Sequence, residues 1–127
     1  MARVTRKRGQ VAVIDLLAPA SQAQGESYNR LERLRDPSHA RALSRRELET
    51  MFSEAGLPLT RSAKLDLNID VEQWLDLTQP APEARDQLLQ ALRHDIAGGP
   101  ATGLRPSESD GRLMGRQDWA IFVAQRP

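Results

Sequence analysis

The chain has 127 residues, a formal net charge of +1 and no cysteine. A chain of this length forms one domain that buries roughly two-thirds of its unfolded surface, and without cysteine it has no disulfides, thiolate zinc sites or cysteine nucleophiles. The near-neutral charge gives no overall attraction to nucleic acid or membrane surfaces, and no apolar run reaches the ~20 residues of a membrane span. We therefore expect one cytoplasmic domain.

The first predicted element is a strand at Gln10–Leu16, before the stop at Pro19. Val11–Ile14 is apolar without alternation, a pattern typical of a strand buried on both faces of a parallel sheet. Two helices are predicted next, the first at about 22–35. The second begins at Ser44, which forms a capping box with Glu47, and it ends before Gly56.

A second strand is predicted from Leu59 to Ile69, where apolar and polar residues alternate as in a strand with one buried face. A short helix follows from Asp70 and a longer one from Pro82, closed by Gly98 and Gly99. The polar stretch 100–111 reads as a mobile loop.

The last predicted strand is Trp119–Ala124, again continuously apolar. The order of elements indicates an α/β layer in which helices cover a three-stranded sheet. Both apolar strands have the pattern of interior strands, yet a three-stranded sheet has only one central position. One of the two must therefore lie at an edge, and we assign the open edge to strand 10–16. The alternative is that helices simply cover both strands and the sheet ends where the chain begins.

Three stretches resemble a known family, and they are "RVTRKRGQVAVIDLLAPA", "YNRLERLRDPSHARALSRRELETMFSEAGL" and "WLDLTQPAPEARDQLLQALRHDI". They resemble the carboxy-terminal half of class I S-adenosylmethionine-dependent methyltransferases of the ubiquinone and menaquinone biosynthesis type. The most specific piece is Arg33–His39 with the helix after it. The resemblance implies a single partial Rossmann-like domain over 1–127, with lid helices at about 22–55.

In that family the strand that resembles 10–16 is the fifth of seven, and the final strand is antiparallel and central, between the fifth and the sixth. The fourth strand and the cofactor-binding glycine-rich turn belong to a first half with no counterpart here. The only glycine-rich stretch, Gly98–Gly103, follows a helix and does not join a strand to one. The resemblance thus implies S-adenosylmethionine as cofactor of the full-length family and none for this chain alone.

The turn into the first strand departs from the family, which usually has Pro-Gly-Gly where this sequence reads Lys7, Arg8, Gly9. A left-handed backbone at Arg8 would cost roughly 1 kcal/mol relative to glycine. The basic stretch Arg3–Arg8 lacks interleaved aromatic residues, so we interpret it as a solvated connection and expect no nucleic-acid partner.

Candidate substrate-lid residues are Tyr28, Asp36, Ser38 and His39. The last three lie in a linker that the resemblance places in the lid, where His39 could accept a proton near neutral pH. The alternative is that they satisfy backbone groups in a turn, and that Tyr28 belongs to the core. No catalytic residue stands out, and with no cysteine and two distant histidines we expect no metal site.

The sequence therefore predicts the substrate-lid part of a small-molecule methyltransferase, unable to bind S-adenosylmethionine or to catalyse alone. Its expected partners are a missing amino-terminal half and a small-molecule methyl acceptor. The alternative is a free-standing homodimeric binding module that pairs through the exposed edge of strand 10–16. A split gene, a mis-assigned start and a decayed gene remain open as origins of such a chain.

Overall fold

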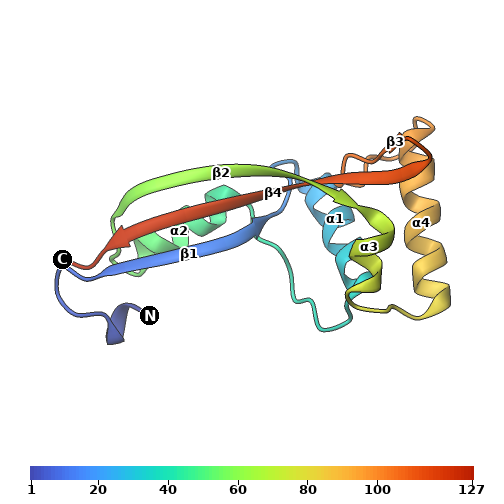
Figure 1. Cartoon of the computed structure of the whole chain (residues 1–127). Helices are drawn as coiled ribbons and strands as arrows, with labels where there is room; N and C mark the ends of the chain where they lie inside the picture. Colours follow the sequence, from blue (N-terminus) through green and yellow to red (C-terminus); the bar gives the residue numbers. More distant parts are fainter.

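The computed structural model describes all 127 residues and confirms the α/β architecture (Figure 1). Two helices follow each of the first two strands, and the last two strands are consecutive. The elements are the 3-10 helix η1 (Ala2–Val4), β1 (Gln10–Leu17), α1 (Gln22–Arg35), α2 (Arg45–Glu54), β2 (Leu59–Asp70), α3 (Val71–Asp76), α4 (Pro82–Ile96), β3 (Ser107–Ser109) and β4 (Arg112–Gln125).

The sheet has the strand order β1-β4-β2, with β4 antiparallel to both of its neighbours. The predicted central and antiparallel position of the last strand is therefore confirmed. β1 pairs with β4 from Gln10, opposite Gln125, to Leu17, opposite Asp118. No strand lies on the other side of β1, so the predicted open edge is present as well.

The region before the last strand differs from the prediction of a mobile loop at 100–111. β4 begins at Arg112, well before Trp119, and β3 pairs with its first residues as a fourth strand. Asp110 and Gly111 connect the two strands with φ values of 51° and 73°. Asp-Gly with two positive φ angles is the preferred two-residue hairpin turn. The residues around this turn are polar, so apolar periodicity in the sequence does not indicate the hairpin.

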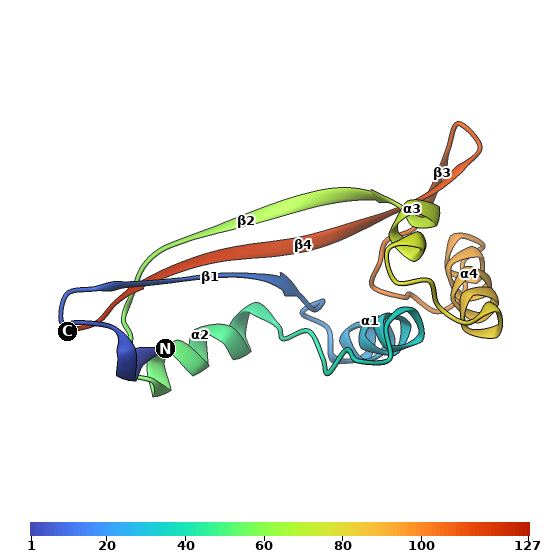
Figure 2. The ribbon, with the colours of Figure 1, turned by 60° about the horizontal axis from the view of Figure 1, so that its bottom comes forward.

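The predicted burial of the first two strands is wrong. In β1 only Val11 and Leu17 are buried, while Ile14 is 65% exposed. In β2 every residue from Thr60 to Asn68 is exposed. Figure 2 shows the reason, because α2 lies on one side of these strands and no element covers the other. An apolar pattern shows which face of a strand tends to be buried. That face is buried only where a helix or another layer packs on it.

The helices lie in two groups along the sheet (Figure 1), and each group forms a separate core with it. Where β4 starts, α1, α3 and α4 enclose a cluster that includes Leu31, Leu75, Leu88 and Leu92. We call this region the closed end. Where β4 finishes, α2 packs its buried Leu48 and Phe52 against one face of the sheet. We call this region, with β1 and the first half of β2, the open end.

The turn before β1 has the strained conformation considered from the sequence. Arg8 adopts φ 60°, and its amide donates to the Arg126 carbonyl at 2.8 Å. A Cβ at Gly9 would lie 2.8 Å from the Arg6 carbonyl oxygen, so glycine is required there. The tight turn brings both ends of the chain together at the open end (Figure 1).

Candidate functional site

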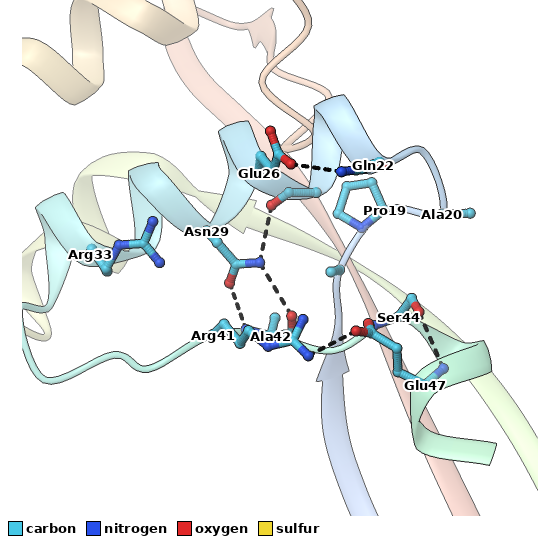
Figure 3. A pocket seen from close by; sticks show the side chains of 12 residues that line it. Pro19, Ala20, Gln22, Glu26, Asn29, Arg33, Arg41, Ala42, Ser44 and Glu47 are labelled. Carbon is cyan, nitrogen blue, oxygen red and sulfur yellow. Dashed lines mark hydrogen bonds and ion pairs between the residues drawn. The ribbon is translucent and has the colours of Figure 1, made fainter. Parts of the chain in front are cut away.

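A polar pocket of about 470 Å³ lies where β1 ends, and we call it the lid groove (Figure 3). Its walls are the loop Ala18–Ala20, one side of α1, and the segment from Arg41 to Glu47. In open α/β sheets, ligands bind in crevices at the carboxyl ends of strands. The lid groove occupies such a position relative to β1.

Asn29 joins two of these walls, α1 and the segment from Arg41 to Glu47 (Figure 3). Its side-chain amide donates to the Gly25 carbonyl at 3.0 Å and to the Ala42 carbonyl at 3.2 Å. Its carbonyl oxygen accepts from the Ala42 amide at 2.6 Å and from His39 Nε2 at 2.9 Å. The amide thereby uses its full capacity of two donors and two acceptor positions. Asn29 thus holds the segment 39–42 against α1.

The wall formed by the segment from Arg41 to Glu47 is fixed by the capping box predicted at the start of α2. The Glu47 amide donates to Ser44 Oγ at 3.3 Å, and the Ser44 amide donates to the Glu47 carboxylate at 2.7 Å. Arg41 pairs with the same carboxylate at 2.8 Å. The Ser44 backbone hydrogen bond and the Arg41 guanidinium lower the pKa of Glu47 from 4.5 to about 2. Glu47 is therefore ionised near neutral pH, and it is better suited to stabilise the start of α2 than to transfer a proton.

Charged groups of both signs line the groove, and several of them make hydrogen bonds to other residues of the chain. Arg33 donates to the Ala40 carbonyl at 3.3 Å, and Gln22 donates to the Glu26 carboxylate at 3.1 Å. Few of the lining residues are apolar. A ligand of this groove would therefore need polar atoms at its surface.

The predicted lid residues Asp36, Ser38 and His39 lie beside the groove and do not line it. Asp36 Oδ1 accepts from the Ser38 amide at 3.0 Å and from Ser38 Oγ at 2.7 Å. These bonds lower the pKa of Asp36. The pair forms the turn that the alternative interpretation described, while His39 reaches back to Asn29.

The contact with Asn29 fixes the tautomer of His39. Because the Asn29 amide nitrogen donates to two carbonyls, its oxygen must face His39, so His39 Nε2 carries the hydrogen. Nδ1 is then the basic atom of the ring.

Tyr28 is buried and lines a smaller pocket of about 190 Å³ that shares Pro19 and Ala20 with the lid groove. Its hydroxyl donates to the buried Glu32 carboxylate at 2.9 Å and accepts from Gln117 at 3.0 Å. Burial, together with the Glu32 charge, raises the pKa of Tyr28 far above its usual value of 10. Tyr28 is therefore neutral and links α1 to β4.

Glu32 has a third partner in Arg35, whose guanidinium lies 2.9 Å from the carboxylate and 4.7 Å from the Trp74 ring centroid. Sequence reasoning missed Glu32 and Gln117 because residues 85 positions apart carry no local signal of contact. Asn29 had one weak signal, since asparagine is unfavourable inside helices unless its side chain bonds to the backbone.

The stretch Gly98–Gly103 ends α4, as predicted, and is not a turn from strand to helix. The Gly99 amide donates to the His94 carbonyl at 2.8 Å, and Gly98 has φ 92°. No three histidine, aspartate or glutamate side chains are grouped so that they could hold a metal ion. None of the helices is both long enough and apolar enough to cross a membrane.

Comparison with known proteins places this geometry in context. No protein-family model matches the sequence. YcgJ of Bacillus subtilis, described as an uncharacterized methyltransferase, is 33% identical over 94 residues, which are 74% of this chain and 37% of that protein. The chain thus spans little more than a third of this relative.

Two crystal structures are similar to nearly the whole chain. A protein of Bacillus halodurans C-125, assigned as a methyltransferase by inference, has a TM-score of 0.84 and 28% identity, over 99% of this chain and 59% of that one. The structure of YcgJ has a TM-score of 0.85 and 25% identity, over 98% and 54% of the two chains. This chain is therefore similar, over nearly its whole length, to part of these longer proteins, which are described as methyltransferases.

Proposed function

We propose that this chain is the carboxy-terminal, substrate-lid half of an S-adenosylmethionine-dependent methyltransferase that acts on a small molecule. The observation that carries the proposal is the open edge of β1 with the lid groove at its carboxyl end. The relatives are methyltransferases by name and extend well beyond the part that this chain matches. A first half would extend the sheet at β1 and bring the methyl donor to the groove.

In this role the chain positions the methyl acceptor and excludes water. Methyl transfer from a sulfonium to a nucleophile depends strongly on alignment, and orientation in a closed site supplies a large share of the rate increase. Asn29 keeps the lid segment in place, while the charged side chains around the groove orient a polar acceptor. His39 bonds to Asn29 and does not line the groove, so we assign it to holding the lid segment, and Asp36 with Ser38 shapes the turn before it.

The chain alone has no glycine-rich turn between a strand and a helix, so we expect it neither to bind S-adenosylmethionine nor to catalyse methyl transfer. Isothermal titration calorimetry of the isolated chain with S-adenosylmethionine tests this directly. We expect no heat of binding at millimolar donor. Tight binding by the isolated chain would refute the proposal.

The open edge also supports a second candidate, a homodimeric binding module in which two copies of β1 pair. Sedimentation velocity separates the two candidates. A dimer that Ala12→Pro dissociates into folded monomers supports the module, because the Ala12 amide faces the open edge and proline there removes a donor without breaking the pairing with β4. A monomer that stays soluble at high concentration argues against it.

A further inference from the structure

The smaller pocket beside Tyr28 shares Pro19 and Ala20 with the lid groove, and we call it the inner pocket. It encloses about 190 Å³, and its lining includes Gln117 on β4 and Arg105 from the loop between α4 and β3. A cavity of about 150 Å³ can hold a benzene molecule, so the inner pocket has room for a single ring or a short chain. Pockets for drug-sized ligands are larger, at roughly 300–1,000 Å³. The inner pocket therefore fits one end of a ligand.

Gln117 is only 6% exposed, yet half of its side-chain amide has no partner in the chain. Its Nε2 donates to the Tyr28 hydroxyl at 3.0 Å and to the Glu32 carboxylate at 3.3 Å. The reverse orientation of the amide would bring its oxygen against this carboxylate, so the orientation is fixed. Oε1 then accepts no hydrogen bond from the chain. Because an unpaired acceptor in a buried side chain is costly, water or a ligand must supply the missing donor.

The loop between α4 and β3 gives the inner pocket a rigid wall. Thr102 donates to the Asp95 carboxylate through its amide at 2.8 Å and through its hydroxyl at 2.7 Å. A Cβ at Gly103 would lie 2.7 Å from Pro19 Cγ and 3.1 Å from Tyr28 Cβ, so this loop packs directly on two other parts of the lining. A pocket whose walls are fixed before binding loses little entropy when a ligand enters.

The charges around the inner pocket disfavour a cationic ligand. Arg105 pairs with Asp118 at 2.9 Å and with Asp66 at 3.5 Å. Arg116 also pairs with Asp66, and Lys64 pairs with Asp118 at 2.8 Å. Three cationic side chains thus share two carboxylates, which leaves one positive charge in excess. This excess charge repels an ammonium group, whereas a neutral hydroxyl or amide N–H meets no such repulsion.

We propose that the inner pocket is a subsite for a neutral hydrogen-bond donor of the methyl acceptor, a hydroxyl or an amide N–H, and that Gln117 Oε1 accepts its hydrogen bond. The proposal rests on the proposed function, since the adjoining lid groove is assigned to the remainder of the acceptor. Gln117 then determines specificity, because an acceptor molecule without a donor leaves Oε1 unpaired.

Three probes that share one aromatic ring test this preference on the isolated full chain. Benzyl alcohol has a neutral donor, benzyl methyl ether has none, and benzylamine is cationic near neutral pH. Nuclear magnetic resonance titration at pH 7 follows the side-chain amide of Gln117 and the backbone amide of Gly103, which both line the pocket. We expect the alcohol to shift both signals and to bind at least about tenfold more tightly than the other two probes.

A matched pair of variants assigns the preference to one side chain. Gln117→Met keeps the length of the side chain and removes the acceptor, so the preference for the alcohol over the ether should disappear. Gln24→Met is the control, because Gln24 also lines the inner pocket, and it should keep the preference. The ratio of the two affinities is the readout, since a purely structural loss weakens both probes alike. If Gln117→Met does not fold, the wild-type ratio and the shift of the Gln117 side-chain amide decide the matter.

Three results would overturn the proposal. They are equal affinities of the wild type for the alcohol and the ether, no binding of the alcohol at tens of millimolar, and binding that leaves the Gln117 signal unchanged. A preference that persists in Gln117→Met also overturns it, because exclusion of the larger ether by size would then be the cause. None of these measurements uses a methyl donor. Tight binding of S-adenosylmethionine by the isolated chain would therefore refute the proposed function alone, and equal probe affinities would refute the subsite alone.

Discussion

The closed and open ends of the molecule differ in how completely their apolar side chains are covered. At the closed end, Leu75, Leu88 and Leu92 are fully buried between helices that all belong to this chain. At the open end, one helix covers one face of the sheet, and Ile14 on the other face is largely exposed. Both ends of the sheet carry apolar side chains. The two ends differ in how many helices of this chain pack over those side chains.

This difference teaches where the stability of the chain resides. The closed end has the larger of the two buried clusters and a buried polar network around Glu32. The open end is held by β-pairing and by α2, with an apolar surface left over. A region with strand patterning but no cover indicates an interface, and mutations at the two ends should therefore have unequal effects.

The largest effect is expected from a matched pair of leucine substitutions. Leu75→Ala at the closed end removes a side chain that is 0% exposed, and we expect a loss of about 2–5 kcal/mol in the free energy of unfolding. Leu65→Ala on β2, at 42% exposure, should cost less than about 1 kcal/mol. Urea denaturation of both variants measures this. Equal losses would contradict the division into two ends.

A smaller effect is expected for Tyr28→Phe, which removes a hydroxyl bound to Glu32 and Gln117. The loss of a partner for a buried carboxylate should cost about 1–3 kcal/mol. Because folding raises the pKa of Tyr28 above 10, the contribution of its neutral hydroxyl is present below pH 10 and declines as the pH rises further. Urea denaturation at pH 7 and above pH 10 should show the difference between wild type and variant shrinking. A constant difference would argue against the buried, neutral hydroxyl.

Arg8→Gly should stabilise the open end. Arg8 adopts φ 60°, and glycine takes this conformation without the cost of a side chain, so we expect a gain of up to about 1 kcal/mol. Arg8→Ala is the control, because it removes the same charge and keeps the strain. If both variants change the melting temperature equally, charge and not backbone conformation is responsible.

The smallest effect concerns acid stability and Glu47. Folding lowers the pKa of Glu47 from 4.5 to about 2, so its contribution is present above pH 4.5 and is lost as the pH falls towards 2. Glu47→Gln should therefore flatten the acid limb of a plot of stability against pH, and chemical denaturation between pH 2 and 6 measures it. An acid limb unchanged from wild type would show that the Ser44 and Arg41 contacts do not hold the charge.

Local signals in the sequence predicted much of the fold. The capping box at Ser44, the strand at 10–16 and the stop after α4 depend on neighbouring residues, and the structure has all three. The central position of the last strand followed from the resemblance to a family. The burial of β1 and β2 could not be predicted, because it depends on covering elements and not on the strands themselves.

Less of the candidate site than of the fold could be predicted from the sequence. The linker 36–39 was recognised and lies beside the lid groove, but the side chain that holds it, Asn29, was not singled out. The network of Tyr28, Glu32 and Gln117 joins residues that only the folded sheet brings together. Contacts between distant parts of a chain leave no periodic pattern, whereas caps and turns do.

Amide hydrogen exchange along β1 tests most directly whether the sheet continues beyond this chain. An edge strand pairs every second amide with its neighbour and directs the others outward. In the isolated monomer we expect alternate amides between Gln10 and Leu17 to be protected by β4 and those between them to exchange rapidly. Uniform slow exchange of all β1 amides in a monomer would contradict an open edge, and with it the assignment of this chain as part of a larger methyltransferase domain.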